Sequence, residues 1–310
     1  MLNHAPAPRG EEVTWGKLLP DALKDLWEAV DEKRVTSEQF YREQQRLLEA
    51  HRNMWREALV LNGYTTLRES LLHELGEYVA CNDLNELERR CSIGWKGVED
   101  EWHERVDPSP SALAIEQFYD RTEAYLYNLT WWHTLVEDDT PLAYVLALQF
   151  GRRHGCRRYL DFGAGISSGG ILFARHGFEV ASADISSSLI KFSEWRFAKR
   201  GIASRLVDLK ANVMPAESFD LITAMDVFEH LVDGAAAVDQ IAGALAPGGL
   251  LYGRFAAEQD DARPQHIARS FVPVFQRFQE LGFEKVWEDE WLWGHQVFQK
   301  PGGGASKVLT

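Results

Sequence analysis

The sequence predicts an α/β protein in which a doubly wound, mostly parallel sheet follows an all-helical N-terminal region. Three observations predict this fold: helical periodicity up to about residue 155, short apolar runs alternating with helical segments from Cys156 onward, and a glycine-rich turn after the first of those runs. A chain of 310 residues is long enough for two domains. We therefore expect a helical cap at 1–140, a sheet domain at 141–300 and a flexible tail at 301–310.

The first half is predicted to be helical by caps, breakers and apolar spacing. Thr36 and Gln39 suit a capping box that opens a helix running to about residue 61. Leucines and a tyrosine recur at three- and four-residue spacing over 67–78, and two shorter helices are expected at 83–90 and 94–106. The segment 107–111 is a break, and Pro110 suits the start of one long aromatic helix over 112–136. A last helix begins at Thr140 and stops at Gly155.

The second half alternates strands and helices. Short apolar runs predict strands at 156–162, 178–185, 204–209, 219–227, 250–256, 283–290 and 292–300. The segments between them predict helices at 168–177, 186–201, 235–245 and 267–282. Repeated units of this kind build a parallel sheet with helices on both faces.

A glycine-rich loop lies where the first strand passes into the first helix of this half. Its sequence, DFGAGISSG over 161–169, lets the backbone approach a ligand closely. Asp184 ends the second strand 21 positions after Gly163, where a nucleoside-binding fold places a carboxylate on ribose hydroxyls. A dinucleotide fingerprint is disfavoured, because Ser168 replaces its third glycine and the carboxylate of Asp161 would repel a pyrophosphate. A purely structural turn remains the alternative.

Four segments in this order resemble the class I S-adenosylmethionine-dependent methyltransferases, particularly the small-molecule group: YLDFGAGISSGG, ASADIS, FDLITAMDVFEHL and LAPGGLL. The resemblance covers about residues 156–299. It implies a Rossmann-like, S-adenosylmethionine-binding catalytic domain whose cofactor leaves as S-adenosylhomocysteine. Ser167 is a departure, since many members carry a third glycine there.

By the same resemblance, the residues expected to hold the cofactor fall into four groups. Asp161, Gly163 and Gly165 would cradle the methionine moiety. Asp184, with Ile185 beside it, would hold the ribose. Asp208 and Leu209 would flank the adenine, and Asp226 would border the sulfonium.

The acceptor side is expected at the carboxyl ends of the strands, where open α/β sheets bind ligands. His266, His133 and Asp226 are the candidate catalytic residues, because an oxygen or amine acceptor needs a proton removed and histidine is a suitable base near neutral pH. His230 belongs to the EHL motif and is as consistent with a structural role. Tyr119 is the candidate lid residue over the cofactor. Core packing is the alternative for the aromatic side chains of 112–136.

Composition limits the partners. Residues 1–150 hold 15 basic and 28 acidic residues, against 18 and 19 in the rest, so the net charge of −14 comes from the first half. Such a surface disfavours nucleic acid and anionic membrane as partners.

The sequence predicts a cytoplasmic protein, because its three cysteines lack metal-ligand spacing and it contains no long apolar run. No metal site is predicted, because the Trp102-His103-Glu104 segment offers only a single pair of candidate ligands. A homodimer is left open.

The predicted function is therefore S-adenosylmethionine-dependent methyl transfer to the oxygen, nitrogen or sulfur of a small molecule. An amine-bearing or zwitterionic acceptor fits the aromatic and acidic first half. Two alternatives remain: an NAD(P)-dependent oxidoreductase on a similar sheet, and a nucleoside-binding protein without catalysis.

Overall fold

A computed structural model describes residues 17–107, 109–134, 139–255, 263–290 and 293–302. Residues 135–136 of the expected aromatic helix and most of the expected tail at 301–310 lie outside this part of the chain. Among the described residues, no helix combines the length and the apolar character that crossing a membrane requires.

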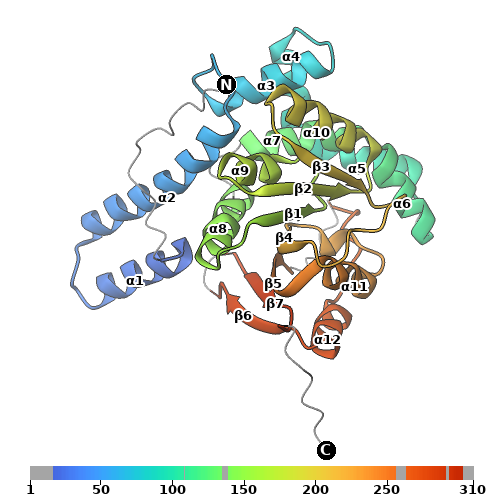
Figure 1. The fold of residues 1–310 in the computed structure, drawn as a ribbon. Helices are drawn as coiled ribbons and strands as arrows, with labels where there is room; N and C mark the ends of the chain where they lie inside the picture. The colour runs from blue at the N-terminus through green and yellow to red at the C-terminus, as the bar shows by residue number, and fades with distance from the viewer. Residues whose placement is uncertain (1–16, 108, 135–138, 256–262, 291–292, 303–310) are drawn as a thin grey trace, which may run out of the picture.

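Eight helices precede the first strand in the part of the chain described. Thr36 caps the second of them as the sequence predicts: its side chain accepts from the Gln39 backbone N–H, and the Gln39 side chain accepts from the Thr36 backbone. The helices are α1 (Leu19–Asp31), α2 (Ser37–Leu59), α3 (Leu67–Tyr78), α4 (Leu84–Ser92), α5 (Gly94–Arg105), α6 (Ala112–Arg121), α7 (Ala124–Thr134) and α8 (Asp139–Arg153). In Figure 1, α1 and α2 extend away from the sheet as a helical hairpin.

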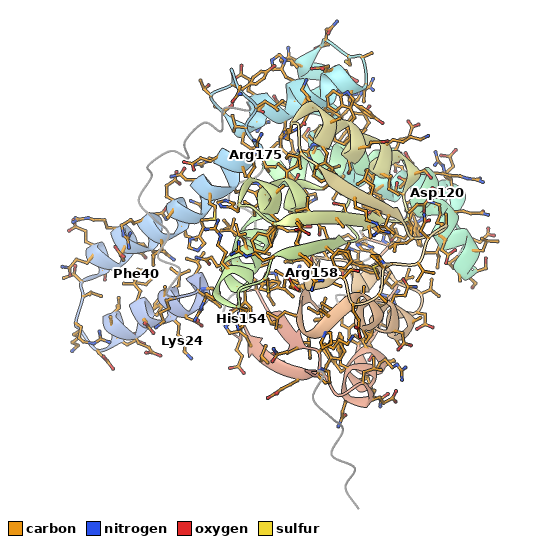
Figure 2. All side chains as sticks on the ribbon, in the orientation of Figure 1. Lys24, Phe40, Asp120, His154, Arg158 and Arg175 are labelled. Atoms are coloured by element: carbon orange, nitrogen blue, oxygen red, sulfur yellow. The ribbon has the colours of Figure 1, made fainter. Side chains whose placement is uncertain are left out.

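The prediction of one long helix over 112–136 is wrong, because α6 and α7 are separate. Thr122 has extended backbone angles, φ −66° and ψ 130°, and ends α6. The break lets the two helices pack on different neighbours: α6 on α10 (Ser187–Lys199), and α7 on α4 and α5. Asp120, labelled in Figure 2, fixes the end of α6 by accepting hydrogen bonds from the Ser187 backbone N–H and Oγ. Tertiary contacts therefore outweigh the helical propensity of this stretch.

The sheet has seven strands in the order β3-β2-β1-β4-β5-β7-β6, and β7 runs antiparallel to β5 and β6. This confirms the predicted doubly wound, mostly parallel architecture. The strands are β1 (Arg158–Phe162), β2 (Glu179–Asp184), β3 (Ser204–Asp208), β4 (Phe219–Ala224), β5 (Leu245–Arg254), β6 (Glu284–Glu288) and β7 (His295–Gln299). The intervening helices are α9 (Ser168–Arg175), α10, α11 (Gly234–Ala244) and α12 (Val272–Glu280), with a 3₁₀ turn at Phe228–His230.

Alternate strand residues enter two hydrophobic cores on opposite faces of the sheet. Tyr159 and Leu221 pack with α8 and α9, whereas Leu160 and Ile222 pack with α11 and α12. Figure 1 shows these helix pairs on opposite sides of the sheet. Burial on both faces explains the continuous apolar runs that mark these strands in the sequence.

The N-terminal helices share the first of these cores. Leu18, Leu19 and the fully buried Trp55 belong to the same hydrophobic cluster as Tyr159 and Val297. A second connection is ionic: Glu74 of α3 pairs with Arg196 and Arg200 of α10. The cap and the sheet therefore pack through a common core rather than across an exposed interface.

Candidate active site

A cavity of about 570 Å³ opens at the carboxyl ends of β1, β2, β4 and β5. Parallel strands bring their carboxyl ends to one edge of the sheet, so side chains far apart in sequence meet there. The glycine loop and the end of β2 form one wall. Helices α5, α6 and α7 form the opposite wall, which includes Trp95, Tyr119, Tyr125, Asn128, Leu129, Trp132 and His133.

The glycine loop needs its glycines for both conformation and space. Gly163 and Gly165 have φ of +71° and +54°, in the region that side chains disfavour. A Cβ on Gly163 would lie 2.5 Å from Val227 Cγ2, and one on Gly165 would lie 2.7 Å from Leu129 Cδ1. Both glycines line the cavity, so their bare backbone is a surface against which a ligand fits closely.

Asp184 lies beside this loop on the cavity wall, followed by Ile185. Its carboxylate accepts hydrogen bonds from the backbone N–H groups of Gly165 and Ser186, both at 2.8 Å. Burial raises the pKa of Asp184, and these backbone hydrogen bonds oppose the rise. Because a carboxylate has about four acceptor positions, Asp184 retains capacity for ligand hydroxyls. The glycine surface and this carboxylate fit a nucleoside cofactor.

Asp161 lies beneath the loop and is not part of the cavity wall. Its carboxyl accepts hydrogen bonds from Thr223 Oγ1 at 3.0 Å and from Tyr144 Oη at 3.4 Å. Burial raises its pKa to about 7. Its other carboxyl oxygen, Oδ2, is buried and has no hydrogen-bond partner among the described residues. The contact with the methionine moiety that the resemblance implies stays a prediction.

Asp208 and Leu209, the two residues expected to flank the adenine, differ in their position relative to the cavity. Leu209 lines the cavity, and its backbone N–H donates to the Asp184 carbonyl. Asp208 is not on the cavity wall and pairs with Lys210 at 3.0 Å. Lys210 also pairs with Asp120 at 3.1 Å, so the end of α6 is tied to the turn after β3. Hydrogen bonds from Ser187 and the neighbouring Lys210 lower the pKa of Asp120 to about 2.

Asp226 follows β4 and lines the cavity in a strained conformation, with φ +51°. Arg254, the last residue of β5, donates from Nη1 to its carboxylate at 3.0 Å. Non-glycine residues held in this region of φ store about 1–3 kcal/mol each and gather at functional sites. Asp226 and Arg254 therefore place a carboxylate and a guanidinium side by side on this wall of the cavity.

Tyr119 joins the cap to the loops after β4 and β5. Its hydroxyl donates to the Gln265 carbonyl at 3.0 Å and lies 2.9 Å from His230 Nδ1. The rings of His230 and His266 lie edge to face, with centroids 4.7 Å apart. Burial, reinforced by His266, lowers the pKa of His230 to about 4. Tyr119 thus lies at the cavity and contacts the EHL motif.

His133 is buried at the cavity wall, between Trp55 and Tyr144. Its backbone carbonyl accepts a hydrogen bond from Trp55 Nε1 at 3.2 Å. Within the described residues, its Nδ1 is buried and has no hydrogen-bond partner. Burial, with a smaller contribution from Arg196, lowers its pKa to about 3, so the imidazole is neutral at pH 7. A titration of His133 near pH 6–7, as a free histidine base would show, is not expected.

Several residues that line the cavity were not predicted from the sequence as site residues, including Trp95, Tyr125, Arg254 and Glu229. Arg254 could have been found, because it ends a parallel strand as Asp184 does. Trp95 and Tyr125 could not, since their helices reach the cavity only through the packing of α5 on α7.

Replacing Ser167 by glycine should stabilise the protein by about 1 kcal/mol. Ser167 precedes α9 with φ +55° and ψ 30°, and its buried hydroxyl has no partner among the described residues. Glycine adopts this conformation without strain. Urea unfolding would measure the change.

The matched control is Ser111→Gly, because Ser111 caps α6 in an ordinary extended conformation and its Oγ accepts from the Ala114 N–H. That variant should be slightly destabilised. Equal destabilisation of both variants would contradict the strain assigned to Ser167.

Comparison with known proteins identifies the fold family. Residues 133–290 match the family described as a methyltransferase domain. The chain is 37% identical over 100 residues to the ubiquinone biosynthesis O-methyltransferase of Parvibaculum lavamentivorans, covering 31% of this chain and 38% of that protein. It is 29% identical over 154 residues to the glycine N-methyltransferase of Rattus norvegicus, covering 44% and 52%.

Among solved structures, the N-methyltransferase NodS from Bradyrhizobium japonicum WM9 has 22% identity and a TM-score of 0.42, over 51% of this chain and 94% of that one. The curated relatives are thus matched over about two fifths to half of their own length. The family match spans half of the sequence and contains every strand from β1 to β6. The chain therefore belongs to the methyltransferase-domain family and has the class I, S-adenosylmethionine-dependent methyltransferase fold.

Proposed function

We propose that this protein transfers a methyl group from S-adenosylmethionine to a small-molecule acceptor. One observation carries the proposal: a single cavity of about 570 Å³ has a nucleoside-type wall on one side and a separate aromatic and polar wall on the other. Such a volume is typical of small-molecule sites. Two ligands bound against these walls would meet near Asp226.

On the donor side, Gly163 and Gly165 would hold the methionine portion, and Asp184 and Ile185 the ribose. Leu209 would contact the adenine, while Asp208 shapes the turn behind it through Lys210. Asp161, which the resemblance also assigns to the methionine portion, is buried and accepts a hydrogen bond from Thr223. When bound, the cofactor supplies a methyl group activated by the sulfonium. The protein has to align the acceptor with that group and exclude water.

On the acceptor side, the cap would supply the specificity. Tyr119, Trp132 and His133 face the cavity from α6 and α7. Asp226 and Arg254 add charges of both signs, which suits a polar acceptor with an oxygen, nitrogen or sulfur nucleophile, including a zwitterion. Because burial lowers the pKa of His133 to about 3, its imidazole is a weak base, and we assign it to hydrogen bonding with the acceptor rather than to proton abstraction.

We further propose that the protein acts in the cytoplasm without nucleic acid. Its three cysteines are free thiols, as expected in a reducing compartment. Its net charge of −14 opposes phosphate backbones. Sedimentation at several concentrations would distinguish a monomer from the homodimer that the sequence leaves open.

Replacing Asp184 by alanine should weaken binding of S-adenosylhomocysteine about ten- to a hundredfold, because charge-assisted hydrogen bonds contribute about 1.5–3 kcal/mol. Calorimetric titration of the wild type and the variant measures this loss. Asp184→Asn keeps the shape of the side chain and separates loss of charge from disturbance of the loop. Asp100→Ala, on the exposed face of α5, is the control and should bind as the wild type does.

An unchanged dissociation constant in both Asp184 variants would place the cofactor elsewhere. A screen with methyl-labelled donor then tests catalysis. Binding of S-adenosylhomocysteine without methylation of any acceptor would favour a nucleoside-binding protein. Tight binding of NADH instead would favour the oxidoreductase.

A further inference from the structure

Three side chains with metal-binding atoms meet at the acceptor end of the cavity. Glu229 and His230 lie in the 3₁₀ turn after β4, and His266 comes from the segment between β5 and α12. One ligand atom from each lies within 4.8 Å of the others. Glu229 is buried, the two histidines are half-buried, and all three line the cavity.

The hydrogen bonds behind His230 provide a second, independent observation. Its Nδ1 lies 3.1 Å from the Gln265 carbonyl, which can only accept, and on this ground we assign the ring proton to Nδ1. The lone pair is therefore on Nε2. Tyr119 Oη, at 2.9 Å from Nδ1, donates to the same carbonyl and holds the arrangement from the side of α6. Histidines that bind metals commonly donate their other ring N–H to a backbone carbonyl in this way.

We propose that Glu229, His230 and His266 bind a first-row divalent cation such as Zn²⁺. Two imidazoles and one carboxylate form a donor set of borderline softness, which suits such ions and not Mg²⁺ or Ca²⁺. Three protein ligands leave at least one coordination position, and the cavity is the space into which it opens. This is the composition of catalytic rather than structural zinc sites.

The role of the cation rests on the proposed function. An acceptor hydroxyl that coordinates the open position would lose its proton to water more readily, because the cation stabilises the resulting oxyanion. The oxygen would then be the nucleophile for the methyl group, and no histidine base would be required. The site therefore selects a hydroxyl-bearing acceptor, and His266 acts as a ligand instead of a base.

The test is metal binding followed by spectroscopy. Protein freed of metal with a chelator is titrated with Co²⁺, whose visible absorption reports its coordination, and with Zn²⁺ by calorimetry. We expect one equivalent to bind, and Glu229→Gln, His230→Ala and His266→Ala each to weaken binding at least tenfold. His266→Gln keeps the size of the side chain in case the alanine variant is unstable. His103→Ala, exposed on α5, is the matched control and should bind as the wild type does.

The outcomes separate this proposal from the proposed function. Absence of a Co²⁺ spectrum, or binding that survives all three ligand substitutions, overturns the metal site, whatever the affinity for S-adenosylhomocysteine. Stoichiometric Co²⁺ binding that depends on the three ligands supports it, even if S-adenosylhomocysteine does not bind and the proposed function fails.

Discussion

Glu74→Gln should lower the free energy of unfolding by about 3–5 kcal/mol, since it leaves buried charges without their partner. Glu74 pairs with Arg200, and its Oε2 lies 3.1 Å from Arg196 Nη2. All three side chains are almost completely buried. Burial lowers the pKa of Arg196 to about 9 and that of Arg200 to about 10, so both remain charged at pH 7. Urea unfolding followed by circular dichroism measures the change.

The substitution should also weaken cofactor binding. Arg196 donates to the Ile166 carbonyl and to Ser168 Oγ, and thus holds the glycine loop in place. The control is Glu77→Gln, one turn of α3 away, where an exposed glutamate pairs with Lys199. Exposed ion pairs contribute at most about 1 kcal/mol. Equal losses in Glu74→Gln and Glu77→Gln would show that the buried network contributes nothing beyond a surface pair.

Gly163→Val should reduce the affinity for S-adenosylhomocysteine at least a hundredfold. Valine at φ +71° is strained, and its Cβ would lie 2.5 Å from Val227 Cγ2, so the loop has to move out of its place on the cavity wall. Calorimetric titration measures the loss of binding, and thermal unfolding shows whether the variant is folded.

The matched control is Gly201→Val. Gly201 has a similar φ of +61°, yet a Cβ there meets nothing within 4 Å. A valine at Gly201 would therefore carry similar backbone strain, but Gly201 is not one of the residues that line the cavity. We expect this variant to lose stability and to keep its affinity for S-adenosylhomocysteine. If Gly163→Val also keeps its affinity, the glycine loop does not hold the cofactor.

The sheet and the donor side of the cavity could be predicted from the sequence because their signals are local. The glycine loop and Asp184 are recognisable by their spacing within the 24 residues 161–184, and each strand is a continuous apolar run. The division of 112–136 into α6 and α7 could not be predicted, since Thr122 has no helix-breaking signal of its own. Its conformation depends on α10 and α5, which meet α6 and α7 only in the folded chain.

The acceptor side depends on contacts between distant segments. Tyr119 and His230 lie 111 positions apart and become neighbours only when α6 packs over the loops of the sheet. Similarly, sequence spacing predicts no metal site, because the residues of the proposed site come from two separate loops. Asp161 shows a further limit: its place in the motif is visible in the sequence, yet only the structure shows that its carboxyl accepts hydrogen bonds from Thr223 and Tyr144.

The hydrophobic cluster that joins the N-terminal helices to the sheet has a consequence for biosynthesis. Leu18, Leu19 and Trp55 belong to the same core as the buried residues of α8 and α9, and α2 packs on both of these helices. At about 5–20 residues per second, the roughly 120 residues between Trp55 and the end of α9 take about 6 to 24 s to translate. During that interval the apolar faces of α1 and α2 lack part of their native core. We therefore expect these two helices to dock only after α9 has been made, and to expose their apolar faces to chaperones until then.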